Sequence, residues 1–263
     1  MVRPHSSDLL SLIAKIVMKW FLFLCTALMA LSSFPGPAWV EGNQEIFANG
    51  PRIEKYRYQA FAIGSEAVQK EIIEMEFRVS DRSVEYISKA ISSEGIEEIT
   101  IHMDSQGRFI SGIRSMANHL ERQVRQERVW RADHRVYVDD NPEKGKKKKE
   151  YELPQGSGLA VDGSLLVLLR SFPFNEDKEW NIFMVDFSGY SVTVTVRQAG
   201  MEKISVPGGE FECYRVEVVV NIPILRPKII YWISKIRPHF LVKHQGKRGP
   251  FTSTYLTSLL SFE

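Results

Sequence analysis

The sequence predicts a mainly β protein, in which a curved antiparallel sheet, an open or half barrel, carries one principal helix packed on its concave face. Runs of β-branched and aromatic residues recur along the chain, and turn signals rich in Gly, Pro and Asp separate them about every ten to fifteen residues. Such spacing leaves no room for the helix-length crossovers that a parallel sheet needs. One apolar segment between these runs has the features of a short helix, which would plug or cover the sheet.

The clearest predicted hairpin pairs Trp180–Phe187 with Tyr190–Gln198 around the turn Ser188-Gly189. Apolar residues alternate with Ser, Thr and Arg along its second strand. This period of two is typical of a strand with one buried face. The residues predicted to face inward are Tyr190, Val192, Val194 and Val196.

The C-terminal part of the chain predicts a four-stranded antiparallel meander. It begins at the turn Val206–Gly209, where Pro207 fixes one φ angle and Gly208 and Gly209 permit positive φ. The predicted strands are Tyr214–Val220, Ile229–Ile233, Phe240–His244 and Thr252–Leu259.

Two irregularities are expected in this meander. A β-bulge near Tyr214-Arg215 would turn apolar residues of both parities inward. The connection Ile222–Pro227 contains two prolines, which remove ladder donors, and we expect it to be exposed. The residues that the bulge would bring to one face are Phe211, Cys213, Val216, Val218 and Val220.

The first part of the chain predicts further antiparallel strands, at Lys55–Phe61, Glu71–Val79, Val84–Ile91, Ile99–Met103 and Phe109–Ile113. Residues 114–139 are ambiguous, because apolar residues recur at helical spacing while two short runs resemble strands. We interpret the region as strands, with Arg128–Trp130 and Arg135–Val138 as the clearest pieces. Its arginines either face water or line an anion-binding groove, and interspersed acidic residues favour the solvent-exposed interpretation.

The predicted helix is Asp162–Arg170. Asp162 can cap the free N–H groups of its first turn, Arg170 suits its negative end, and Pro173 prevents extension. Because the segment is apolar nearly all round, we expect it to be buried on more than one side.

The N-terminal residues 1–38 have the layout of a secretory signal peptide. Arg3, Lys15 and Lys19 precede an apolar run at Trp20–Leu31, whose 12 residues are fewer than the roughly 20 that a membrane-spanning helix needs. Small residues at Gly36 and Ala38 predict cleavage after Ala38 and a single exported, periplasmic domain over 39–263, with its core at about 55–259. A retained anchor is the alternative, and Met18 is an alternative start.

The cysteines and charges exclude several classes of protein. Leu24 precedes Cys25, where a lipid-attachment signal needs a small residue, so lipidation is not expected there. Removal of the leader leaves Cys213 alone, which predicts a buried apolar strand residue and no disulfide. The mature chain has equal numbers of basic and acidic residues, which argues against a general nucleic-acid binder.

The basic block at Lys144–Lys149 follows an acidic, turn-rich segment. It predicts a solvated hairpin loop. The functional alternative is contact with an anionic membrane surface through Lys146, Lys147, Lys148 and Lys149.

Several of these segments together resemble the domain-of-unknown-function 3108 family. They are the helix segment Asp162–Ser171, the turn Val206–Phe211 before a Val-rich strand, Tyr231–Ile233 and Phe240–Lys243. The resemblance covers roughly Lys55 to Leu259. It implies an exported Gram-negative protein, whose shape is related to the curved sheet and plugging helix of periplasmic lipoprotein carriers. It transfers no catalytic residues, and Glu210 departs from the usual small residue after the motif glycine.

No catalytic, cofactor or metal motif stands out. The histidines form no His-x-x-x-His pair in a helical context, and neither a nucleophile elbow nor a phosphate-binding loop occurs. We therefore expect a non-enzymatic protein without cofactors that binds a lipid or other apolar envelope ligand. The alternative is a scaffold that binds an envelope protein partner. The candidate ligand-binding residues are Leu165, Leu166, Leu168, Leu169, Val194, Val216, Val218 and Trp232.

Overall fold

The computed structural model describes residues 50–63, 70–118, 124–139, 148–174, 176–222, 226–247 and 253–263, all within the compact unit Pro37–Glu263. The predicted signal peptide, its cleavage site and Cys25 lie outside the described residues. So do Lys146, Lys147 and most of the apolar part of the predicted connection Ile222–Pro227.

The described residues form fifteen strands of a single sheet. They are β1 (Arg52–Ile63), β2 (Lys70–Val79), β3 (Ser83–Ile91), β4 (Gly95–Asp104), β5 (Phe109–Asn118), β6 (Val124–Ala132), β7 (Arg135–Asp139), β8 (Lys149–Glu152), β9 (Gly158–Val161), β10 (Glu179–Val185), β11 (Ser191–Val206), β12 (Gly209–Val220), β13 (Lys228–Ser234), β14 (Leu241–Lys247) and β15 (Thr254–Phe262).

The sheet is a meander that grows outward from β1 in both directions. From β1 the chain proceeds strand by strand to β8 at one edge, then passes to β9 at the other edge and returns to β15, which pairs with β1. Neighbouring strands pair antiparallel except β9 and β10, which are parallel. The predicted mainly β class and antiparallel meander are therefore confirmed.

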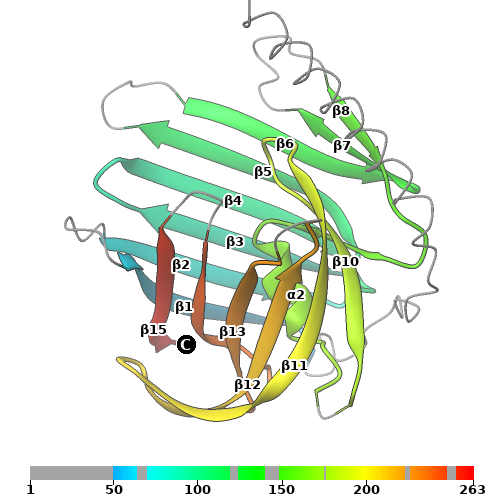
Figure 1. Ribbon diagram of the computed structural model, residues 1–263. Helices are drawn as coiled ribbons and strands as arrows, with labels where there is room; N and C mark the ends of the chain where they lie inside the picture. Colours follow the sequence, from blue (N-terminus) through cyan, green and yellow to red (C-terminus); the bar gives the residue numbers. More distant parts are fainter. Residues whose placement is uncertain are drawn as a thin grey trace, which may run out of the picture. The chain divides into compact units, whose positions relative to one another are not determined.

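The sheet is curved and does not close. Its two arms, β1–β8 and β10–β15, face one another in Figure 1, and the segment that contains β9 and the helix α2 (Ser164–Leu169) lies between them. Besides pairing with β10, β9 also contacts β5. The edge strand β9 is thus covered, and all four of its residues are buried.

Alternating burial explains which face of each strand meets the core. Along β1, Tyr56, Tyr58 and Ala60 are buried while Lys55 and Arg57 are exposed. A buried residue is paired with a buried residue on the neighbouring strand, because directly opposed residues share a face. Tyr58 lies opposite Ile73 of β2, for example, and both are buried.

Only a short helix occurs where a principal helix was predicted. α2 has six residues, five of them buried, so its burial is as expected but helix is a very small part of the structure. Its N-cap is Gly163, and no side chain caps it. Asp162 instead has a positive φ of 37° and directs its carboxylate toward the backbone N–H of Phe187. Arg170 does not sit at an exposed helix end, because it is buried in an ion pair.

The predicted hairpin forms as β10 and β11, but one residue that was predicted to face inward is exposed. Val194 and Val196 are buried and Val192 is partly buried, but Tyr190 is 56% exposed. Tyr190 precedes β11 and belongs to the turn, where strand alternation does not apply. The ambiguous region 114–139 forms strands, as interpreted, in β5, β6 and β7.

The expected bulge lies on the neighbouring strand. β12 pairs with β13 without a shift, whereas the pairing of β11 with β12 shifts between Gln198 and Gly200, opposite Arg215 and Val216. Cys213 is buried, as predicted, and burial raises the pKa of its thiol to about 12.

The glycine turn between β11 and β12 folds back onto β15. Gly208 donates its N–H to the carbonyl of Leu259 at 3.0 Å. A Cβ on Gly208 would lie 3.2 Å from that carbonyl oxygen and from Leu259 Cγ, so a side chain there would crowd the contact. Gly209 alone uses the positive φ that the sequence suggested for both glycines.

We predict that Val194→Asp destabilises the fold by about 4 kcal/mol or more, because it buries a carboxylate without a partner in the core. Urea denaturation measures the loss. The matched control is Met201→Asp on the same strand, where the side chain is 59% exposed and the charge stays in water. Equal denaturation midpoints for the two variants would contradict the facing of β11.

Candidate functional site

The candidate ligand-binding residues all lie in the apolar core or pack against it. Leu165, Leu168 and Leu169 of α2 belong to the same buried apolar cluster as Val194, Val216 and Val218 of the sheet, and Leu166 is partly buried against it. These side chains fill the space between α2 and the sheet.

Trp232 is also buried and belongs to the same apolar cluster, and its indole has polar partners as well. It is opposite Arg215 in register, and Arg215 alternates with Val216 along β12. Its Nε1 donates to the Glu202 carboxylate at 3.0 Å, and the Lys243 ammonium lies 5.0 Å from the centre of its ring. Trp232 is thus part of the apolar interior and is also held by charged side chains.

The C-terminal end of the α2 segment is fixed by a buried ion pair that the sequence did not reveal. Arg170 contacts Glu54 of β1, and both side chains are less than a tenth exposed. Arg170 also donates from Nε to the carbonyl of Pro238 at 3.0 Å, and its guanidinium lies 4.4 Å from the centre of the Phe77 ring. Arg170 therefore ties α2 to β1, β2 and the turn before β14.

The Glu54 carboxylate has further partners. Arg52 lies 2.5 Å from it, and the Tyr56 hydroxyl donates to it at 2.8 Å. Burial acts to raise the pKa of Glu54, but the charge of Arg170 and the hydrogen bonds from Arg170, Arg52 and Tyr56 outweigh burial, so its pKa lies below the usual value. Glu54 is thus held ionised.

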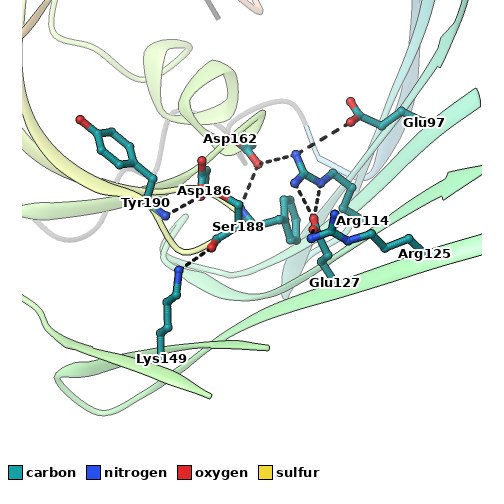
Figure 2. Close-up of polar contacts among 10 residues, drawn as sticks. Glu97, Arg114, Arg125, Glu127, Lys149, Asp162, Asp186, Ser188 and Tyr190 are labelled. Carbon is teal, nitrogen blue, oxygen red and sulfur yellow. Dashed lines mark hydrogen bonds and ion pairs between the residues drawn. The ribbon is translucent and has the colours of Figure 1, made fainter. Parts of the chain in front are cut away.

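The N-terminal end of the α2 segment meets a second group of charges, drawn in Figure 2. The Arg114 guanidinium of β5 donates to the fully buried carboxylate of Glu127 at 2.6 Å. Arg125 contacts the other oxygen of Glu127 at 2.7 Å. Arg114 also lies 3.9 Å from Asp162 and 3.9 Å from Glu97. Its contact with Asp162 joins the α2 segment to the sheet arm β1–β8.

The surroundings of Asp162 destabilise the ionised form of its carboxylate. Burial raises its pKa to about 6; the charge of Arg114 opposes that rise, while Asp186 and Glu97 add to it. Its carboxylate accepts a long hydrogen bond, 3.4 Å, from the N–H of Phe187. The two ends of the α2 segment are therefore held unequally.

Side chains of β8 attach the free edge of the sheet to the turn between β10 and β11. The Lys149 ammonium donates to the carbonyl of Ser188 at 2.8 Å (Figure 2). The Tyr151 hydroxyl donates to the carbonyl of Gly189. Asp186 shapes this turn by accepting from the Ser188 hydroxyl and from the Tyr190 N–H, both at 2.7 Å. Lys149 is thus engaged within the protein, and Lys148 lies 5.2 Å from the centre of the Trp130 ring.

The described residues offer no grouping of three or more His, Cys, Asp or Glu side chains placed to hold a metal ion. His102 faces outward on β4, 3.8 Å from Glu85. Within the same ranges, no helix is long and apolar enough to cross a membrane.

We predict that Arg170→Met costs about 3 to 5 kcal/mol of unfolding free energy, because it leaves Glu54 buried without its main counter-charge. Chemical denaturation at pH 7 measures the effect. The control is Lys203→Met, which breaks an exposed ion pair with Glu210 and should denature like the wild type. If both variants behave alike, the buried ion pair is not what fixes α2.

We predict that Asp162→Asn changes how stability depends on pH. Because the folded-state pKa of Asp162 is raised from its ordinary 3.8 to about 6, the folded protein binds this proton more tightly than the unfolded chain does. The wild type should lose stability as pH rises from about 4 to about 6, and the variant should lack that loss. The variant should therefore be the more stable protein at pH 7.5, by on the order of 2 kcal/mol.

Thermal melts between pH 4 and pH 8 measure this difference. Glu210→Gln, an exposed change, serves as the control for an altered carboxylate. Parallel pH profiles for the wild type and Asp162→Asn would contradict the raised pKa.

Comparison with known proteins places this architecture in a family. The model of the family described as protein of unknown function (DUF3108) matches residues 56–249. Among curated proteins, none matches the chain in sequence. Solved structures similar to it include the following three.

The first is a candidate lipoprotein from Parabacteroides distasonis, at 10% identity and a TM-score of 0.33, with 80% of this chain and 94% of that chain covered. The second is a candidate exported protein with a YmcC-like fold from Bacteroides fragilis, at 11% identity and a TM-score of 0.31, with 86% and 100% covered. The third is a candidate outer-membrane lipoprotein-sorting protein domain from Vibrio parahaemolyticus, at 10% identity and a TM-score of 0.23, with 84% and 89% covered. The match of the family model over residues 56–249 confirms the resemblance noted in the sequence: this chain belongs to the DUF3108 family of proteins of unknown function.

Proposed function

We propose that the protein is a non-catalytic binding protein of the cell envelope, which holds the apolar chain of a lipid between its curved sheet and the α2 segment. The observation that carries the proposal is the position of α2. It is a six-residue apolar helix, inserted between the two arms of the sheet and buried at five of its six residues. The space that it fills has the apolar lining that an acyl chain requires.

Burial of the apolar side chains of α2 and burial of an acyl chain would contribute comparable free energies. The four buried apolar side chains of α2 contribute roughly 2 kcal/mol each, or about 8 kcal/mol together. They are Leu165, Val167, Leu168 and Leu169. An acyl chain with a dozen buried methylenes contributes about 10 kcal/mol at about 0.8 kcal/mol each. Exchange of α2 for a ligand is therefore near balance, as reversible binding requires.

The proposed location follows from the leader. The basic start, short apolar run and small residues before Trp39 support export to the periplasm and removal of residues 1–38. A periplasmic protein meets lipids that leave one membrane for the other, and an apolar interior shields such chains from water.

A scaffold function is the second candidate, and one observation favours it. The side chains between α2 and the sheet form a single buried cluster, as expected if that space never opens. In that case the protein acts through its surface, by binding another envelope protein.

We predict that protein purified from cells without detergent carries a lipid. Native mass spectrometry should show a mass increment over the mature chain, and organic extraction should release the ligand. Protein denatured before the measurement is the control, since it should lose the increment. If the protein has a ligand-free mass and takes up no added lipid, the lipid-binding proposal is wrong and the scaffold function remains as the candidate.

A further inference from the structure

We propose that the lipid carries an uncharged head with a hydrogen-bond acceptor, such as the carbonyl of an ester, and that this head takes the place of the Asp162 carboxylate beside Arg114. The inference rests on the proposed function and names the class of lipid. It makes the α2 segment the part of the chain that the ligand displaces.

The place of Asp162 lies at the boundary between the core and water. The side chain of Asp162 is 28% exposed, while the leucines that follow it in α2 lie in the apolar core. At the other end of the segment, Arg170 is buried and bound to Glu54, so that end stays closed. A lipid whose chain takes the place of α2 therefore brings its head to the place of Asp162.

Two hydrogen-bond donors are directed at this place. The backbone N–H of Phe187 reaches the Asp162 carboxylate at 3.4 Å. Arg114 donates from Nε to Glu127 at 2.6 Å, whereas its Nη1 atom lies 3.9 Å from the Asp162 carboxylate, beyond hydrogen-bond distance. A carbonyl oxygen only accepts hydrogen bonds, and it can accept from both donors once Asp162 has left.

The charges around this place oppose a negative head. Glu97 lies 3.9 Å from the same Nη1 atom of Arg114 and is drawn on the opposite side of the guanidinium from Asp162 in Figure 2. Burial, together with the charges of Asp186 and Glu97, raises the pKa of Asp162 to about 6 in spite of Arg114. A ligand carboxylate at this point would meet the same surroundings, whereas an ester adds no charge.

A cationic head does not suit the place either. Such a head has hydrogen-bond donors only, so it would leave the N–H of Phe187 and the Nη1 of Arg114 without an acceptor. It would also put a second positive charge beside the Arg114 guanidinium. An uncharged acceptor is therefore the head that fits both the donors and the charges.

The test compares two probes that differ only in the head, methyl palmitate and palmitate. Binding to the delipidated mature protein is measured at pH 7.5, below the micelle concentration, by displacement of a fluorescent fatty-acid methyl ester. We expect the ester to bind at least tenfold more tightly than the acid.

Any apolar interior disfavours a carboxylate, so a variant has to show that this place sets the preference. Glu97→Gln/Asp186→Asn removes two negative charges and should reduce the ratio of the two dissociation constants at least threefold. Glu97→Gln alone, at a side chain that is 39% exposed, should reduce the ratio in part, and it replaces the double variant if that does not fold. The control is Glu98→Gln, at a side chain that is 54% exposed and paired with Lys89, which should keep the wild-type ratio.

Asp162→Asn tests whether the ligand displaces the segment. At pH 7.5 the variant should hold the closed segment more firmly, because it has no carboxylate that gains from returning to water. Both probes should then bind at least fivefold more weakly than to the wild type, with their ratio unchanged. Binding of wild-type strength would show that the head does not take the place of Asp162, and the inference would be wrong.

The outcomes separate the inference from the function on which it rests. If palmitate binds as tightly as the ester, or if the Glu97→Gln/Asp186→Asn protein keeps the wild-type ratio, the lipid-binding function stands and the assignment of the head is overturned. If neither probe binds the wild type, the lipid-binding function fails, and the assignment fails with it. A preference for the ester that is reduced in this variant and kept in Glu98→Gln supports both.

Discussion

The ion pair between Arg170 and Glu54 is the contact on which the rest of the interior depends. Two buried charges are stable only when they face one another with their remaining hydrogen bonds satisfied, and here Arg52, Tyr56 and the carbonyl of Pro238 complete the set. The pair thereby fixes one end of the α2 segment to the first strand of the sheet. Removing either partner alone would leave an uncompensated buried charge, at a cost of about 3 to 5 kcal/mol.

A curved sheet that does not close has to hold its two arms together by other means. Polar contacts help to do this, among them Arg170 with Glu54, Arg114 with Asp162, and Lys149 with Ser188. The first two attach the α2 segment to strands of the first arm, and the third attaches the turn between β10 and β11 to β8. Apolar side chains form the core between these contacts. The polar contacts fix the positions of the arms around this core.

The sequence predicted the strands well, because apolar and polar residues alternate along each strand and this pattern can be recognised within a few residues. It predicted the helix less well: an apolar stretch such as Leu165–Leu169 suits a buried segment of any form, and six residues of helix leave the sheet dominant. The ion pairs could not be predicted at all. Arg170 and Glu54 are 116 positions apart, and no local pattern distinguishes either from a solvated residue.

The two ends of the α2 segment differ in a way that follows from their surroundings. Glu54 has two arginines and a hydroxyl around it, so its charge is stabilised despite burial. Asp162 shares its one close arginine with Glu127 and Glu97, so burial prevails and raises its pKa. The difference gives the segment one firmly held end, at Arg170, and one weakly held end, at Asp162. For the lipid-binding function proposed above, this asymmetry would let the segment open at Asp162 while it stays attached at Arg170.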